Sequence, residues 1–198
     1  TLKNEIGDLE DLDVTNGAAL VTRPPTGEIL AMIGSVDYFA TDSGTFNVTT
    51  ALRQPGSSIK PINYAIGIDR KLVTAATVFI DTPTCFTASG QPQGYCPVNY
   101  DGKFHGPQAL RFSLGNSYNI PAVKMLAVNG VKEFVASSSG FTIESFKDPK
   151  NYGLSLTLGG GEVKMTEMAA AFSAFANRGK AKKLTEILKI EDKFGKTL

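Results

Sequence analysis

Several residue types are scarce in this sequence of 198 residues, which has two cysteines, one histidine and no tryptophan. A single histidine and the absence of a C-x-x-C pair leave too few ligands for a zinc site built from cysteine and histidine. Long apolar runs are also missing, and none approaches the ~18 residues that a membrane span needs. The first residues lack the basic and apolar regions of a signal peptide. We therefore expect no metal site and no targeting or anchoring segment within these residues.

The sequence also has no excess of either charge, because 20 Lys and Arg residues are balanced by 19 Asp and Glu residues, which leaves a net charge of +1. The basic residues are scattered singly, so the sequence has no electrostatic footprint for nucleic acid or an anionic membrane. A hydrophobic content of 42% with 20% charged residues is typical of a folded globular domain. Binding must then come from a shaped site.

The two cysteines, Cys85 and Cys96, flank a stretch rich in Gly, Gln and Pro that predicts a loop at residues 86–95. Their spacing suits a short loop closed by a disulfide in an oxidising compartment. Two unpaired thiols fit the spacing equally well. Residues 81–106 as a whole predict a long irregular segment, which in a compact domain is usually functional or disordered.

The order of elements indicates an α+β fold with helices in the middle of the chain. Residues 17–23 and 28–36 predict a β-hairpin, and residues 184–198 predict two more strands that share its sheet. The acidic stretch 1–16 is expected to be a linker or the start of the domain. Periodicity and the positions of proline and glycine predict helices at residues 61–72, 107–117, 121–130, 131–140 and 165–179.

The stretch RQPGSSIKP, residues 53–61, places Ser57 and Lys60 three residues apart where a helix begins. On a helix these positions share one face, with Cβ atoms ~5–6 Å apart. A serine hydroxyl becomes a good nucleophile only when a base takes its proton, and a lysine is such a base when burial disfavours its ammonium form. The positive end of the helix dipole would act in the same direction. The motif therefore indicates a serine activated by its neighbouring lysine.

An isolated S-x-x-K is more often a serine that caps a helix and an exposed lysine. A second motif favours the chemical interpretation. S-x-N occurs once, at Ser117 and Asn119, in the break between two predicted helices, where side chains can face a cleft. On its own, this second motif would be read as a loop cap.

Both motifs occur in a chain that resembles the transpeptidase domain of the bifunctional, class A penicillin-binding proteins. The resemblance covers nearly the whole sequence and rests on blocks in the same order, at residues 17–39, 51–70, 100–126 and 156–179. It implies the fold of penicillin-binding proteins and serine β-lactamases, in which an antiparallel sheet packs with helices beside a mainly helical subdomain.

The resemblance also implies a function, a peptidoglycan D,D-transpeptidase that cross-links stem peptides ending in D-Ala-D-Ala. Ser57 would attack the penultimate D-alanine carbonyl, with Lys60 as base, and form an acyl-enzyme that an amine of a neighbouring stem peptide resolves. Ser117 would relay a proton, and Asn119 would bind Lys60 and the substrate amide. β-Lactams would acylate the same serine, and neither a metal nor an organic cofactor is implied.

The family's third motif, K-T-G, is absent. The nearest match, G-K-T-L at residues 195–198, has Leu198 where the motif needs its glycine. The resemblance therefore implies that residues 17–198 are the N-terminal part of the domain, that a companion segment carries K-T-G, and that this chain alone is inactive. It also implies a glycosyltransferase domain upstream and a membrane anchor that holds the protein at the extracytoplasmic face of the bacterial plasma membrane.

Three alternatives to a transpeptidase remain. A D,D-carboxypeptidase would use the same residues with water as acceptor. A serine β-lactamase is disfavoured because Glu162 lacks the E-x-x-x-N pattern of a deacylating base, and we expect it to begin a helix instead. A non-catalytic penicillin sensor is disfavoured because nothing structural requires all four motif residues.

Overall fold

The computed structural model describes residues 2–87 and 94–198, so part of the loop predicted at 86–95 lies outside the described residues. The chain divides into two compact units. One contains Thr1–Arg53, Phe141–Ser145 and Val163–Leu198, and the other contains Gln54–Gly140 and Phe146–Glu162. We call them the hairpin unit and the helical unit.

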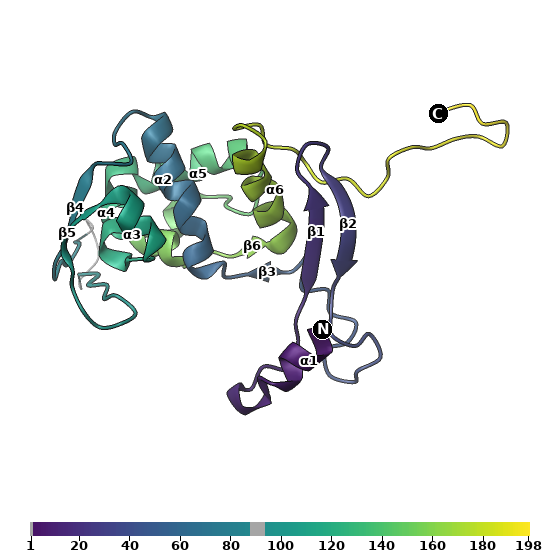
Figure 1. Ribbon diagram of the computed structural model, residues 1–198, viewed down its shortest axis with the longest axis horizontal. Coiled ribbons are helices and arrows are strands. Elements are labelled where there is room, and N and C mark those ends of the chain that lie inside the picture. Colours follow the sequence, from purple (N-terminus) through teal and green to yellow (C-terminus); the bar gives the residue numbers. More distant parts are fainter. Residues whose placement is uncertain (1, 88–93) are drawn as a thin grey trace. The chain divides into compact units, whose positions relative to one another are not determined.

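The hairpin unit begins with α1 (Leu2–Gly7) and the short 3₁₀ helix η1 (Glu10–Leu12). The predicted hairpin follows, with β1 (Ala19–Arg23) antiparallel to β2 (Glu28–Ile33), as Figure 1 shows. Two short strands also pair here, β3 (Leu52–Arg53) and β6 (Val163–Lys164), and β6 leads directly into α6 (Met165–Ala176). Helix α6 packs against β1.

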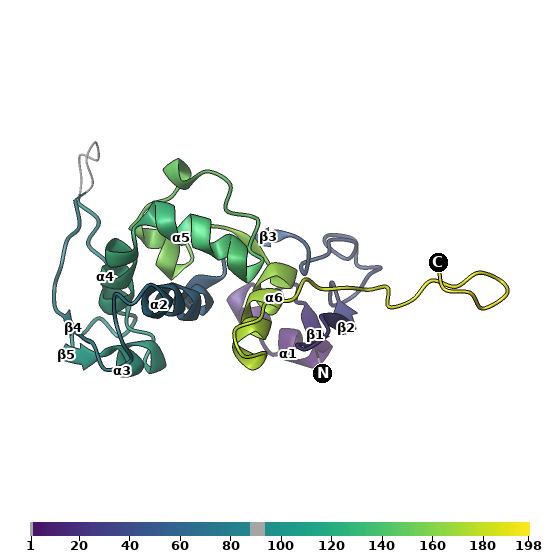
Figure 2. The same ribbon diagram turned by 90° about the horizontal axis from the view of Figure 1, so that it is seen from above.

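The helical unit is built on α2 (Lys60–Asp69) and α4 (Asn119–Asn129), which pack against each other. Figure 2 shows α2 between α3 (Leu110–Gly115) and α5 (Val131–Ser138). Strands β4 (Val78–Asp81) and β5 (Gly106–Ala109) pair antiparallel at one end of this unit. Short 3₁₀ helices complete it: η2 (Gly56–Ile59), η3 (Ser139–Phe141, which ends in the hairpin unit), η4 (Pro149–Asn151) and η5 (Leu154–Leu158).

A buried asparagine links the central elements of the helical unit. The Nδ2 of Asn63, on α2, donates to the carbonyl oxygen of Ala122 on α4 at 3.0 Å and to the Oγ1 of Thr157 on η5 at 2.8 Å. The carbonyl oxygen and the Oδ1 of Asn63 both accept from the Nδ2 of Asn129. Since each buried polar group must find a partner, these bonds fix the relative position of α2, α4 and η5. These bonds thereby hold the first residues of α2 and α4 in fixed positions relative to each other.

Most of the predicted elements are confirmed, with shifts at their boundaries. The hairpin and the helices at 61–72, 121–130, 131–140 and 165–179 are present. The helix predicted from Pro107 starts instead at Leu110, because residues 106–109 form β5. The helix predicted from Pro121 starts two residues earlier, at Asn119, since proline fits any position of a first turn.

Three strand and helix predictions are wrong. Residues 184–198 form isolated bridges, Glu28 with Thr185 and Glu191 with Thr197, and no regular strands. The described strands make three sheets of two strands each, so the terminal segments do not share one continuous sheet. Glu162 precedes β6, and the acid in the first turn of α6 is Glu167. Isolated bridges and strands of two residues leave too short a pattern to be read from sequence.

The glycine run at 159–161 contacts the turn that carries Ser57. Gly159 has φ +92°, and a Cβ placed on it would lie 2.3 Å from the backbone nitrogen of Gly56. Neither the dihedral angle nor the contact suits a larger residue. The backbone on the N-terminal side of Ser57 is therefore held against η5 by a contact that only glycine permits.

We predict that Gly159→Ala lowers the free energy of unfolding by at least about 1 kcal/mol, because the strained backbone and the displaced Gly56 both cost energy. Urea unfolding of the variant measures this loss. Gly115→Ala is the matched control, since no atom lies within 4 Å of its added Cβ. A Gly159→Ala protein as stable as the wild type would contradict the packing described.

Candidate active site

Two serines stand side by side in η2, and their hydroxyl groups differ in environment. The Oγ of Ser58 donates to the carbonyl oxygen of Pro55 at 2.6 Å, so its hydroxyl is occupied within the turn. Ser57 is exposed, lines a pocket and has no side-chain hydrogen bond to any residue that the structure describes. Of the two, Ser57 has the hydroxyl that can face a ligand.

Lys60, the first residue of α2, is 1% exposed. Its Nζ donates to the carbonyl oxygen of Ser117 at 2.6 Å, to the Oδ1 of Asn119 at 2.7 Å and to the Oγ of Ser117 at 3.1 Å. All three acceptors are neutral and belong to the predicted S-x-N motif. The two motifs, far apart in the sequence, therefore meet at one amino group.

Burial lowers the pKa of Lys60 from 10.5 to about 8. The cause is desolvation, since removing an ammonium from water favours the neutral amine. A carboxylate partner would oppose this effect, but within residues 2–87 and 94–198 no acid forms an ion pair with Lys60. A pKa one unit above pH 7 leaves roughly a tenth of the amines neutral at that pH, which is suitable for a general base.

The S-x-N segment presents its acceptors through an uncommon backbone conformation. Ser117 has φ +56°, in the left-handed region that residues with a Cβ rarely adopt. In this conformation both its carbonyl oxygen and its hydroxyl lie within hydrogen-bonding distance of Lys60. Such strain clusters at functional sites, where the surrounding structure holds it in place.

Three hydrogen bonds fix the position of Asn119. Its Oδ1 accepts from Lys60, its Nδ2 donates to the carbonyl oxygen of Val98 at 2.7 Å, and its backbone N–H donates to the Oδ1 of Asn99 at 2.7 Å. Sequence reasoning did not single out Asn99. The only signal in the sequence was the position of Asn99 within residues 81–106. These residues were predicted to form a long irregular segment, and such segments are usually functional or disordered.

A cavity of about 480 Å³ joins these residues in the helical unit. Ser57, Ser117 and Asn119 line it, so the structure brings three of the four predicted site residues to one cavity, with Lys60 hydrogen-bonded beneath it. The other lining residues are Asn99, Tyr100, Asp101, His105, Asn116 and Tyr118. An exposed serine and a buried lysine of lowered pKa, three residues apart in the chain, are the components of an activated nucleophile.

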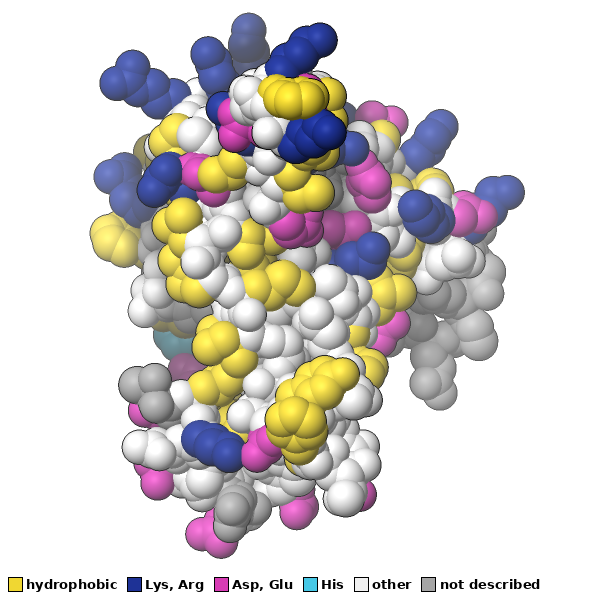
Figure 3. Space-filling view, turned by 90° about the vertical axis from the view of Figure 1, so that its right-hand side faces the viewer, with side chains coloured by type: hydrophobic (Ala, Val, Ile, Leu, Met, Phe, Trp, Pro, Cys, Tyr) yellow, Lys and Arg dark blue, Asp and Glu magenta, His cyan; other side chains and the backbone are white. Residues whose placement is uncertain are grey.

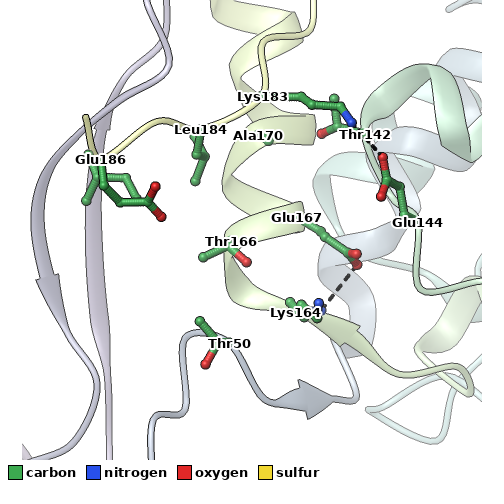
Figure 4. Close-up of a pocket in the computed structure, with 11 residues that line it drawn as sticks. Thr50, Thr142, Glu144, Lys164, Thr166, Glu167, Ala170, Lys183, Leu184 and Glu186 are labelled. Carbon is green, nitrogen blue, oxygen red and sulfur yellow. Dashed lines mark hydrogen bonds and ion pairs between the residues drawn. The ribbon is translucent and has the colours of Figure 1, made fainter. Parts of the chain in front are cut away.

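The hairpin unit has a second cavity, of about 310 Å³, drawn in Figure 4. There the Nζ of Lys183 points toward Glu144, with 2.9 Å between nitrogen and oxygen. Glu167 lies near the start of α6 and accepts from the backbone N–H of Lys164. These charged groups already have partners, and no serine or cysteine lines this cavity. We therefore assign the chemistry to the cavity that contains Ser57.

Cys85 and Cys96 form a disulfide, which settles the alternative that the sequence left open. Cys96 stands two residues before Val98 and three before Asn99, both of which bond to Asn119. In the described part of the chain no cluster of His, Cys, Asp and Glu could hold a metal ion. The described helices include none with the length and apolarity of a membrane span.

A family model, that of the penicillin binding protein transpeptidase domain, matches residues 17–197. The chain belongs to this family. Its relatives include penicillin-binding protein 1C of Escherichia coli, 37% identical over 77% of the chain, and penicillin-binding protein 1A of Rickettsia bellii, 32% identical over 96%. The chain spans only 19% and 23% of these two proteins, respectively.

Solved structures of penicillin-binding proteins have the same fold. Penicillin-binding protein 1A from Haemophilus influenzae superposes with a TM-score of 0.78 at 32% identity, over 92% of this chain and 26% of that one. The TP domain of penicillin-binding protein 3 from Burkholderia pseudomallei gives a TM-score of 0.72 at 20% identity, over 92% and 57%. The α+β fold of penicillin-binding proteins and serine β-lactamases, predicted from the sequence, is confirmed.

We predict that the lowered pKa of Lys60 makes the folded chain more stable as the pH rises from about 8 to 10.5. In this window the unfolded chain keeps the lysine proton that the folded chain has lost, so the free energy of unfolding rises with pH. Urea unfolding of wild type and Lys60→Met, which cannot titrate, measures the effect as a difference between them. A difference that stays constant from pH 8 to 10.5 would show that the pKa of Lys60 is not lowered.

Proposed function

We propose that this chain is the acylating part of a serine-type peptidoglycan D,D-transpeptidase. Ser57 attacks the penultimate D-alanine carbonyl of a stem peptide that ends in D-Ala-D-Ala. Lys60, in its neutral form, takes the proton of Ser57 as the new bond forms. The observation that carries the proposal is that Lys60 is buried with three neutral acceptors, and that two residues of its acceptor segment, Ser117 and Asn119, line one cavity with the exposed Ser57.

Ser117 has the role of a proton relay in this scheme. Its Oγ lies 3.1 Å from the Nζ of Lys60 and also faces the cavity. The proton taken from Ser57 passes through Lys60 and Ser117 to the nitrogen of the leaving D-alanine, which departs as a neutral amine. Asn119 holds Lys60 through its Oδ1, and its amide group binds the peptide backbone of the substrate.

The acyl-enzyme is then resolved by an amine of a second stem peptide, which completes the cross-link and frees Ser57. β-Lactams acylate Ser57 in the same way. Water as the acceptor would make the protein a D,D-carboxypeptidase, rapid hydrolysis of acylated penicillin would make it a serine β-lactamase, and a lasting adduct without peptide turnover would make it a sensor.

The partners of the chain also belong to this proposal. The hairpin unit exposes the apolar side chains Val21, Leu30, Met32 and Ile33 on its strands, and yellow side chains are visible on the face that Figure 3 views. Exposed strands of this kind are normally covered. A companion segment that bears K-T-G covers them in our proposal and adds binding groups to the site.

The presence of this companion segment should raise the acylation rate by roughly 10²–10³-fold. Equal acylation rates with and without the segment would contradict its proposed role.

The disulfide between Cys85 and Cys96 supports an oxidising compartment, and so a position at the extracytoplasmic face of the bacterial plasma membrane. In the complete protein we propose an upstream glycosyltransferase domain and a membrane anchor, as in bifunctional penicillin-binding proteins. The transpeptidase step would then cross-link glycan strands that the same protein polymerises.

We predict that a labelled penicillin, reacted with the complete protein, forms its adduct on Ser57. Peptide mapping by mass spectrometry locates the adduct. Ser57→Ala should abolish labelling, whereas the neighbouring Ser58→Ala is the matched control and should retain it, because the Ser58 hydroxyl is bonded within its own turn. An adduct on Ser58 or Ser117 would refute the assignment. Release of D-alanine from a stem peptide, with formation of a cross-linked product, separates the transpeptidase from its three alternatives.

A further inference from the structure

A buried carboxylate lies behind the S-x-N segment. Asp81, the last residue of β4, is 0% exposed. Its Oδ2 accepts three hydrogen bonds: from the Nδ2 of Asn99 at 2.8 Å, from the backbone N–H of His105 at 3.0 Å and from the Nδ1 of His105 at 2.8 Å. These bonds offset part of the cost of burying a carboxylate, whose Oδ1 has no hydrogen-bond partner among the described residues. Neither the motif chemistry nor the proposed reaction uses this acid.

Asn99 connects Asp81 to the start of α4. One hydrogen of its Nδ2 is donated to Asp81 and the other to the carbonyl oxygen of Lys103 at 2.8 Å, which fixes the direction of the amide. Its Oδ1 then accepts from the backbone N–H of Asn119. Tyr118, the residue before α4, makes no side-chain capping bond. Asn99 therefore takes the place of the cap, from a different part of the chain.

A second link reaches the middle residue of the same segment. The ring of His105, held by Asp81 through its Nδ1, stacks on the ring of Tyr118 with 4.1 Å between centroids and 15° between planes. Tyr118 stands between Ser117 and Asn119 in the chain. Asp81 thus reaches two of the three residues of the S-x-N segment through one intermediate side chain each.

We propose that Asp81 is a positioning residue for acylation, which holds the segment Ser117–Asn119 against Lys60 through Asn99. The inference rests on the proposed function, since acylation is the reaction that it serves. A charged acceptor strengthens the bonds from Asn99 and His105, because hydrogen bonds to an ionised group are roughly twice as strong as neutral ones. The backbone of Ser117 is thereby kept in the left-handed conformation, in which its carbonyl oxygen and its Oγ both accept from the Nζ of Lys60.

The test begins with Asp81→Asn in the complete protein. The amide keeps the shape but loses the charge, so the Asn99 link weakens and Asn119 loses its fixed acceptor. We expect the Asn119 amide to exchange its hydrogen at least ~10-fold faster relative to the amide of Val123, a buried residue of the same helix. We also expect the acylation rate constant at saturating penicillin to fall by roughly 10- to 100-fold.

A merely structural role for Asp81 predicts a different pattern. Loss of overall stability would accelerate the exchange of Asn119 and Val123 alike and leave the acylation rate of the folded fraction unchanged. Asp69→Asn is the matched control, because it removes the same charge from an exposed position of the helical unit. It should behave as the wild type in both measurements.

Asn99→Ala cuts the same link from the other end and leaves Asp81 bonded to His105, so it serves as a second variant should Asp81→Asn fail to fold. It should reproduce the faster exchange of the Asn119 amide and the slower acylation. In the double variant the two effects on the acylation rate should not multiply, since both remove one connection.

Unchanged exchange of the Asn119 amide in Asp81→Asn, or effects that multiply in the double variant, would overturn the positioning role. Failure of the wild type to acylate at Ser57 would overturn the proposed function instead. In that case the exchange measurement would still decide whether Asp81 positions Asn119.

Discussion

The burial of one ammonium group, that of Lys60, sets the requirements that the rest of the site meets. An ammonium without an acidic partner is unfavourable in a protein interior, and proteins respond by lowering its pKa. Here three neutral acceptors satisfy its three hydrogens, and desolvation brings its pKa to about 8. A carboxylate in their place would keep the lysine charged and so unable to take a proton. The neutrality of the acceptors is therefore as important as their geometry.

The helical unit provides the rigidity that this arrangement needs. Asn63 ties α2 to α4 and η5, so the residue that begins α2 and the residue that begins α4 keep a fixed separation. The contact of Gly159 with Gly56 fixes the turn before Ser57. The proposed nucleophile, the proposed base and its acceptors thus come from three short segments, η2, the first turn of α2 and the S-x-N segment. Positioning of this kind lowers the entropy that the reaction must lose.

The local geometry of the two motifs follows from the sequence. Ser57 and Lys60 share a helix start, so their proximity follows from helical geometry, and the break at Ser117–Asn119 follows from the order of helix signals. The contact between the two motifs could be expected only through the family resemblance, since nothing in the spacing dictates which neutral acceptors Lys60 finds. Asn99 and Asp81 were missed for the same reason. Their importance lies in partners about 20 residues away in the chain, within a segment without regular periodicity.

The fold was predictable where patterns were long and uncertain where they were short. The hairpin and α6 have strong periodic signals and were predicted correctly. β3 and β6 have two residues each, and β5 lies in a stretch that reads as a helix start because of Pro107. In these elements pairing with a distant segment decides the structure, and local propensity is overridden.

The protonation of Lys60 tests this account most directly. NMR titration of the protein labelled with ¹³C at lysine Cε, with the Lys60 signal assigned by its loss in Lys60→Met, reports the pKa of this one amine. The account predicts a midpoint at about 8. A midpoint near 10.5, the value of an ordinary lysine, would contradict it, because Lys60 would then be charged in the working protein and could not accept the proton of Ser57.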